Sequence, residues 1–268
     1  MKPTWSSLLI KYFFILLAVA VVLYPLVWMI TMAFKPYPEW STVQGLTWLP
    51  KDPTLQNFEF LFYGHANGLV VTLDRTVVMP MISSLVTSTL GTAIAVICGT
   101  LSSYAVVRFG QAPSMPLSIL QLRLFPPLAV MIPVMVMWAF MGAIDTWWGL
   151  SIIYGIVTLP FGFWLMKTFF EEVPIEIEEA ARVAGSSRFR VFWKITLPIV
   201  KPGLATCVLF VFIMNWSDYL LSLLLTQKEW VTLPVYMSTL SAAMSGQMYG
   251  MKAALGILAA VPPVVFGL

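Results

Sequence analysis

Long runs without a charged residue are the feature of this sequence that most restricts its fold. The segments from Tyr12 to Phe34 and from Thr76 to Val107 contain no Asp, Glu, Lys or Arg. Each exceeds the roughly 20 apolar residues that an α-helix needs to cross the hydrocarbon of a bilayer. Because a backbone in hydrocarbon must satisfy its own hydrogen bonds, these runs predict membrane-spanning helices.

The overall composition agrees with a membrane protein. Hydrophobic residues make up 59% of the 268 residues and charged residues only 10%, against roughly 25% charged residues in soluble domains. A soluble fold of this length could not cover its surface with so few polar groups. Cys98 and Cys207 both lie in apolar runs and indicate neither a disulfide framework nor a metal site. The only histidine, His65, is expected on a loop surface.

The apolar runs predict an all-α polytopic membrane protein that forms one domain over residues 1–268. Six transmembrane helices are expected, at about 9–34, 77–107, 115–141, 148–169, 203–226 and 250–268. Prolines 126, 127 and 133 interrupt the third of them. The first run is too long for a signal peptide and is not followed by a small-residue cleavage pattern, so we expect it to remain as a helix.

The distribution of positive residues predicts the orientation. With the N-terminus inside, ten of the 15 lysine and arginine residues lie on the inner side and five on the outer side. An excess of positive residues marks the cytoplasmic side of membrane proteins. We therefore expect both termini in the cytoplasm, together with the connection between the fourth and fifth helices.

That connection, at about residues 171–202, is the charged segment of the chain. It is rich in Glu, Lys and Arg, which are too costly to place in hydrocarbon, yet its apolar residues recur at helical spacing. Pro174 suits the start of a short helix, Gly185 its left-handed end, and Ser186 or Ser187 the cap of a second helix. Leu197-Pro198 and Lys201-Pro202-Gly203 are expected to stop that second helix before the next apolar run. These features predict a docking surface, and an ordinary solvated loop helix is the alternative.

The sequence contains none of the motifs that would make the chain an enzyme. It has no G-x-x-x-x-G-K-[ST] phosphate loop, no H-E-x-x-H and no nucleophile elbow. ATP hydrolysis by this chain alone is therefore not expected. No catalytic residue, cofactor site or metal site is predicted.

A polar cluster in the fifth predicted helix is a candidate for the translocation path. Trp216, Ser217, Asp218 and Tyr219 follow one another there. A carboxylate inside a spanning segment normally faces a polar cavity or a partner, and aromatic rings beside it suit sugar rings and hydroxyls. The alternative is an interfacial or structural hydrogen-bonding role.

The charged segment resembles the EAA loop of permease subunits of bacterial ABC importers. That loop has the pattern E-A-A, three residues, G, nine residues, I-x-L-P, which Glu179-Ala180-Ala181, Gly185 and Ile195-Thr196-Leu197-Pro198 match. Other stretches are similar to the second permease subunit of maltose-type carbohydrate importers. They are Phe125-Pro126 with Pro133, residues 142–150, Trp216-Ser217-Asp218-Tyr219 and Leu233-Pro234-Val235.

The resemblance implies a multi-subunit machine in the bacterial inner (cytoplasmic) membrane. This chain would pair with a second permease subunit, and two ATP-binding cassette subunits would bind ATP and Mg²⁺ and dock on the cytoplasmic loops. A periplasmic or extracellular solute-binding protein would deliver a sugar or sugar derivative. Lipid would surround the helices, and nucleic acid is not an expected partner. The residues implied in ATPase coupling are Glu179, Ala180, Ala181, Gly185, Leu197 and Pro198.

Two other classes of protein compete with this interpretation. A secondary transporter of a small polar solute would show two halves of similar helix pattern and intramembrane charges for coupling ions, and neither is clear here. A membrane-embedded enzyme or scaffold lacks its catalytic residues. The sequence also departs from the family at Ala184 and Ser217, where Asp and Asn are frequent. It ends at Gly267-Leu268 within the apolar run, where family members continue into a polar tail, so we expect a truncated end.

Overall fold

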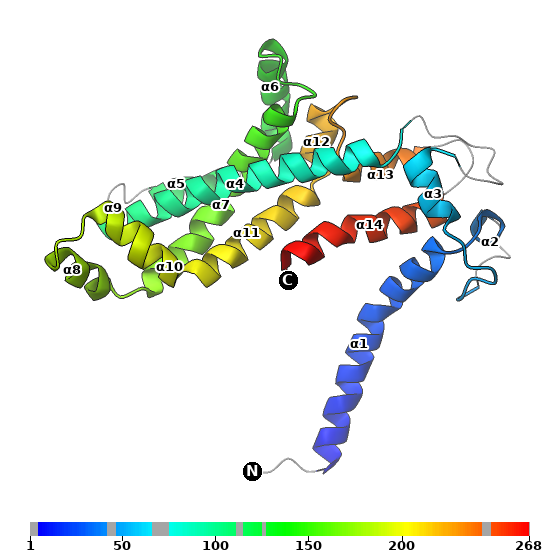
Figure 1. The fold of residues 1–268 in the computed structure, drawn as a ribbon, viewed down its shortest axis with the longest axis horizontal. Coiled ribbons are helices and arrows are strands. Elements are labelled where there is room, and N and C mark those ends of the chain that lie inside the picture. The colour runs from blue at the N-terminus through cyan, green and yellow to red at the C-terminus, as the bar shows by residue number, and fades with distance from the viewer. Residues whose placement is uncertain are drawn as a thin grey trace. The chain divides into compact units, whose positions relative to one another are not determined.

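The computed structural model describes residues 5–41, 47–65, 75–110, 115–124, 127–242 and 248–267. All the regular elements in these ranges are helices (Figure 1), which confirms the all-α class. The chain divides into two compact units. Unit 1 is Met1–Val78 with Tyr236–Val261, and unit 2 is Met79–Val235 with Pro262–Leu268.

Unit 1 contains the first predicted transmembrane helix. Helix α1 (Trp5–Ala33) is apolar along its length, and its apolar side chains are largely exposed. The short helices α2 (Tyr37–Ser41) and α3 (Gln56–Tyr63) follow, together with most of α13 (Leu233–Ala242) and of α14 (Tyr249–Gly267). The buried Asn57 side chain donates hydrogen bonds of 2.8 Å to the carbonyls of Ala33 and Lys35. These bonds satisfy carbonyl groups at the end of α1 that the helix itself leaves without partners.

Unit 2 is organised around three long helices. Helix α4 (Val78–Phe109), α7 (Trp147–Glu172) and α11 (Lys201–Trp216) run alongside one another in Figure 1. Helices α5 (Met115–Leu124) and α6 (Pro127–Phe140) precede α7, and α5 packs against it. The short α12 (Leu220–Leu225) packs against α6 and α7. Helix α7 is therefore the common neighbour of this unit.

Helices α4 and α7 approach each other through glycine. A Cβ atom added to Gly99 would lie 2.8 Å from the backbone nitrogen of Phe163, and one added to Gly91 would lie 2.6 Å from Cβ of Tyr154. Small residues allow this close approach of membrane helices, whose association depends on van der Waals packing and interhelical hydrogen bonds. One such bond crosses from α11 to α4, where the buried Asn215 amide donates to Thr92 Oγ1 at 3.2 Å.

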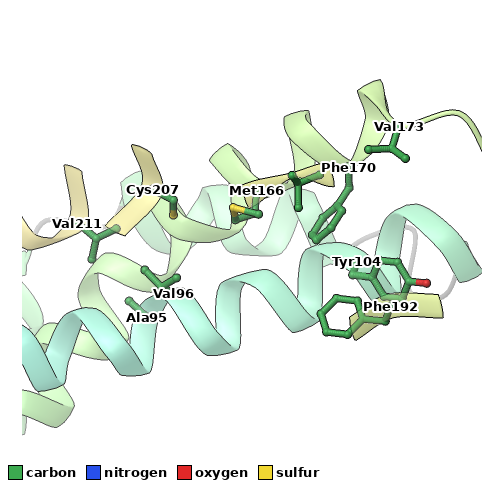
Figure 2. Close-up of a cluster of buried hydrophobic side chains, with 10 residues drawn as sticks. Ala95, Val96, Tyr104, Met166, Phe170, Val173, Phe192, Cys207 and Val211 are labelled. Atoms are coloured by element: carbon green, nitrogen blue, oxygen red, sulfur yellow. The ribbon is translucent and has the colours of Figure 1, made fainter. Parts of the chain in front are cut away.

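The apolar core of unit 2 lies along the same three helices and extends into the charged segment (Figure 2). Cys207 is fully buried in it as a small apolar side chain, whereas Cys98 is exposed. At one end of the cluster the Tyr104 ring lies between those of Phe170 and Phe192, with ring centroids 5.4 and 4.7 Å away. The core therefore continues beyond the spanning helices to the first elements of the charged segment.

In the described ranges, four helices are long and apolar enough to cross a membrane, namely α1, α4, α7 and α14. The count rises to five if residues 188–199 and α11, which meet at an angle of 75°, form one bent span. These elements lie where spans were predicted at 9–34, 77–107, 148–169, 203–226 and 250–268. Residues 125–126, between α5 and α6 in the third predicted span, lie outside the described residues, as does Leu268.

Two predictions in this part of the chain are wrong. The helix expected over residues 203–226 is two helices, because α11 ends at Trp216 and α12 begins at Leu220. Asp218 therefore lies in a turn rather than inside a helix. In the third predicted span, α5 and α6 lie on either side of residues 125–126, and Pro133 lies inside α6 without the interruption that was predicted there.

The second helix of the charged segment ends at Ile199, within the stretch where Leu197-Pro198 and Lys201-Pro202-Gly203 are predicted to stop it. Helix α9 (Arg188–Val191) continues through a π-helical turn, η2 (Phe192–Thr196), into α10 (Leu197–Ile199). The N–H of Leu197 bonds to the carbonyl of Phe192, five residues earlier. Proline disrupts a helix by lacking an N–H and by clashing with the preceding turn; the wider π-turn and the first turn of α10 accommodate Pro198. The chain bends two residues later, at Val200.

Substitution of Gly99 tests the close approach of α4 and α7. We expect Gly99→Ala to lower the free energy of unfolding by about 1–3 kcal/mol, because the added methyl group meets backbone atoms rather than a movable side chain. Thermal unfolding of the purified protein in detergent measures this loss. Cys98→Ala, at the neighbouring exposed position of the same helix, is the control and should cost little. Equal stability of the two variants would contradict the observed packing.

Candidate functional site

The charged segment starts where α7 leaves the apolar core. Helix α7 continues to Glu172, and Pro174 then precedes α8 (Ile175–Val183). Glu176 and Glu178 lie in the first turn of α8, where negative charge stabilises the positive end of the helix dipole. Pro174 was predicted to be the first residue of the helix, but it is the cap residue just before it.

The predicted glycine turn ends α8. Gly185 has a φ of +87°, which favours glycine, and nothing lies within 4 Å of a Cβ atom added there. The N–H of Ser186 donates to the carbonyl of Ala181 at 3.0 Å, which closes the last turn of the helix. Ser187 then caps α9, and its hydroxyl accepts the N–H of Arg190 at 3.3 Å. This confirms the two helices and the turn predicted from Gly185 and the serines.

Most of the residues implied in ATPase coupling lie on the exposed surface of this segment. Glu179, Ala180 and Gly185 are exposed, and Ala181 is partly exposed. At the other end of the segment Pro198 is exposed and Leu197 is partly buried against the core. Val183, at the end of α8, is 90% exposed, which is unusual for valine. The arrangement presents a small-residue helical surface with an apolar end.

The residue next to Glu179 has the opposite environment. Glu178 is buried, and its carboxylate accepts a hydrogen bond of 2.9 Å from Tyr104 Oη. It also forms an ion pair of 2.7 Å with Arg108 Nε in the last turn of α4. Arg108 Nη2 donates to the carbonyl of Val173 at 2.9 Å. Glu178, Tyr104 and Arg108 are not among the site residues predicted from the sequence. The signal that could have found the ion pair is an acidic residue one turn after Ile175 together with the arginine that closes the uncharged run 76–107.

A second anchored carboxylate lies at the other end of α7. Asp145, in the turn between α6 and α7, has a φ of 57°. Its N–H donates to the carbonyl of Leu225 at 2.8 Å. Its carboxylate accepts four consecutive backbone N–H groups at 2.8–3.2 Å, from Gln227, Lys228, Glu229 and Trp230. One side chain thus fixes the loop that follows α12 to the start of α7.

The hydrogen bonds also determine the ionisation of Asp145. Burial alone would raise the pKa of the carboxyl group, but the four backbone N–H groups outweigh it. The pKa therefore lies below its ordinary value of 3.8. The ionised form is the one that binds the loop.

The candidate translocation residues differ in burial and in hydrogen-bond partners. Asp218 Oδ1 accepts the N–H groups of Leu221 and Ser222 at 3.0 and 3.3 Å, so it caps the first turn of α12. The hydroxyl of Tyr154 on α7 donates to the same oxygen at 3.4 Å. Trp216 is buried and stacks on Phe212, whereas Ser217 and Tyr219 are exposed. Asp218 therefore stabilises the start of α12, independently of any role in transport.

The surface of unit 2 carries apolar grooves. The described ranges hold no group of three or more His, Cys, Asp or Glu side chains that could bind a metal ion. A groove of about 370 Å³ lies between α4 and the start of α7, lined by Leu90, Ala93, Ile94, Ile97, Cys98, Trp147, Trp148, Ser151 and Ile152. Walls of this kind suit lipid chains or another apolar helix rather than a charged ligand.

Comparison with known proteins identifies the class. Residues 91–268 match the family described as binding-protein-dependent transport system inner membrane component, and the chain belongs to this family. It is 31% identical to the trehalose transport system permease protein SugB of Mycobacterium tuberculosis, over 93% of this chain and 88% of that protein. It is 28% identical to the galactooligosaccharides transport system permease protein GanQ of Bacillus subtilis, over 97% and 90% of the two chains.

The fold also has a counterpart among solved structures. A chain of a bacterial ABC transporter involved in the import of the acidic polysaccharide alginate superposes with a TM-score of 0.77 at 20% identity, over 99% of this chain and 96% of that one. The family assignment confirms the predicted ABC permease class and favours it over a secondary transporter. It also makes this chain a transport subunit of the membrane rather than an enzyme.

Removal of the Asp145 charge tests the anchor before α7. We expect Asp145→Asn to lower the free energy of unfolding by about 1–2 kcal/mol at neutral pH, at the low end because the group is partly exposed. Since the folded-state pKa is lowered, the contribution is fully present above the ordinary value of 3.8 and is lost as the pH falls through the folded pKa. Thermal unfolding between about pH 3 and 7 measures both effects.

The exposed Asp52 provides the control for this experiment. Asp52→Asn should change stability little at any of these pH values. A difference between Asp145→Asn and the parent that does not shrink in acid would contradict the role of the ionised carboxylate.

Proposed function

We propose that this chain is the permease subunit of a binding-protein-dependent ABC importer for a sugar or sugar derivative, and that it forms half of the translocation pathway. The observation that carries the proposal is similarity along almost the whole chain to permeases named for trehalose and galactooligosaccharides. The structural neighbour from an alginate importer agrees with a carbohydrate substrate.

The assembly requires partners that supply what this chain lacks. A second permease subunit completes the pathway, and a solute-binding protein delivers the sugar on the outer side. Two ATP-binding cassette subunits bind ATP and Mg²⁺ and hydrolyse the nucleotide. In the bacterial inner membrane, six spans with a cytoplasmic N-terminus place the charged segment in the cytoplasm, with α5 and α6 as the third span and α9–α12 as the fifth.

Helix α8 is the proposed docking element for one ATP-binding subunit. Its exposed residues Glu179 and Ala180 supply a charge and a low surface for close contact. Gly185 fixes the turn to α9, and Leu197 and Pro198 support the return of the chain to α11. ATP-driven closure of the motor subunits displaces α8, and the chain on both sides of it moves with it as rigid helices.

Helix α7 provides the mechanical link from α8 into the membrane. Its 26 residues form one helix from Trp147 to Glu172, which corresponds to a length of roughly 39 Å. That length exceeds the roughly 30 Å of bilayer hydrocarbon. A displacement at the α8 end therefore reaches the Asp145 anchor at the opposite end of the same helix.

Charge reversal at Glu179 tests the docking role. We expect Glu179→Lys to reduce the ATP-binding subunit that co-purifies with the permease by roughly tenfold or more, because a like charge at an interface costs several kcal/mol. Membrane insertion should be unchanged, since Glu179 is exposed. Quantitative pull-down of the affinity-tagged permease from solubilised membranes measures the loss.

Glu172→Lys is the matched control, because Glu172 is also exposed and lies outside α8. The control variant should retain the ATP-binding subunit. Equal retention by Glu179→Lys and by the parent would count against docking on α8.

The role of Asp218 in transport can be separated from its role as a helix cap. Asparagine can still accept the N–H groups of Leu221 and Ser222 but carries no charge. If Asp218 faces the solute, we expect Asp218→Asn to reduce uptake or change the preference among sugars while assembly stays intact. Uptake of radiolabelled trehalose and maltodextrins by the assembled importer in proteoliposomes measures this effect.

Ser217→Ala, at the adjacent exposed position, is the control for uptake. Normal uptake and preference with Asp218→Asn, together with impaired assembly of Asp218→Ala, would leave the cap as the only function of this carboxylate.

A further inference from the structure

Helix α8 is attached to the rest of unit 2 through an unusual side chain. Glu178 is the one residue of the fully described α8 that is buried. Ile175 and Ile177, its large apolar residues nearest the core, remain 45% and 42% exposed. Helices on protein surfaces are normally held by an apolar stripe. Here the inward position is a carboxylate.

The partners of Glu178 come from two other helices. Arg108 Nε, at the end of α4, lies 2.7 Å from Glu178 Oε1, and the two side chains are only 7% and 8% exposed. The same guanidinium donates through Nη2 to the carbonyl of Val173 at the end of α7. Charge-assisted bonds from the planar guanidinium fix direction as well as distance. Arg108 therefore joins α4, α7 and α8 at one point.

Tyr104 of α4 is the second partner of Glu178, and packing fixes the position of its ring. Its ring is held between Phe170 of α7 and Phe192 of η2 (Figure 2). Its hydroxyl donates to Glu178 Oε2 at 2.9 Å. The two carboxylate oxygens thus have separate partners, both on α4. Breaking a buried ion pair leaves a charge without compensation, so the bound geometry is strongly preferred.

We propose that Arg108, Tyr104 and Glu178 form a positioning junction that fixes α8 to the end of α4, so that α4 follows every displacement of α8. The inference rests on the proposed function of α8 as the docking element. In the absence of this junction α8 keeps its covalent connections to α7 and α9 and its packing against α9. Movement imposed on α8 is then taken up by the turns at Val173 and Gly185 instead of by α4.

Distance measurement in the assembled importer tests the junction. Spin labels are attached through Val183→Cys on α8 and Leu101→Cys on α4, both exposed positions, in a Cys98→Ser background. The complete transporter is reconstituted in nanodiscs, and distances are measured by electron paramagnetic resonance with and without Mg-ATP. In the parent we expect one narrow distance that is the same in both conditions.

Removal of either charge should release α8. We expect Glu178→Gln and Arg108→Gln to lose the single narrow distance and to become sensitive to Mg-ATP. The double exchange Glu178→Arg with Arg108→Glu should recover the narrow distance at least in part, which a loss of packing would not explain. Glu176→Gln, an exposed position of the same helix, is the matched control and should behave as the parent.

Tyr104→Phe keeps the test decisive if the charge variants do not assemble. This change removes only the hydroxyl and leaves the ring between Phe170 and Phe192. We expect a broader α8–α4 distance and a ratio of solute transported to ATP hydrolysed that is lower by roughly twofold to tenfold. Trehalose and maltodextrins serve as the uptake probes. A distance as narrow as that of the parent in Glu178→Gln, or in Tyr104→Phe if only that variant assembles, would overturn the inference.

The Glu178 and Glu179 variants test the junction and the docking proposal separately. If Glu178→Gln leaves α8 fixed while Glu179→Lys releases the ATP-binding subunit, the junction is refuted and docking on α8 stands. If Glu178→Gln releases α8 while Glu179→Lys has no effect on the subunit, the attachment of α8 to α4 stands and the docking proposal fails.

Discussion

The close packing of α7 against its neighbours is the interaction on which the rest of unit 2 depends. Glycine residues bring α4 and α7 so near that added Cβ atoms would overlap the facing helix, and α11 packs along α7. Because apolar side chains gain little from leaving lipid, this contact relies on van der Waals packing and a few buried hydrogen bonds. A helix fixed in this way can carry structures at both ends without losing its position.

Three carboxylates, each in a different environment, hold elements of unit 2 to α7 or to α4. Asp145 binds four backbone N–H groups at the start of α7, and Glu178 pairs with Arg108 beyond its end. Asp218 caps α12 and contacts Tyr154 in the middle of the unit. Each of these carboxylates has hydrogen-bond donors, because an unpaired buried charge is costly. These three acidic residues therefore act first as anchors, and a role in transport must be compatible with those bonds.

The sequence predicted the parts of the fold that depend on local signals. Uncharged runs located α1, α4, α7 and α14, and the glycine and serine signals located the turn at Gly185 and the cap at Ser187. It could not predict which of two adjacent glutamates faces the core. Glu178 and Glu179 have identical side chains. They differ because Arg108 and Tyr104, which are distant in the sequence, bind Glu178. The π-turn before Pro198 and the break at Asp218 likewise depend on packing that no local pattern records.

The central claim is that a separate motor subunit acts on the exposed surface of α8. The most direct measurement is cross-linking from a single cysteine at Ala180→Cys, in a Cys98→Ser background, within the assembled importer in native membranes. We expect a short bifunctional reagent to join this position to the ATP-binding subunit, with a yield that changes when Mg-ATP is added. Failure to cross-link in an intact complex, together with labelling of this cysteine by an impermeant thiol reagent from the outer side, would contradict the claim.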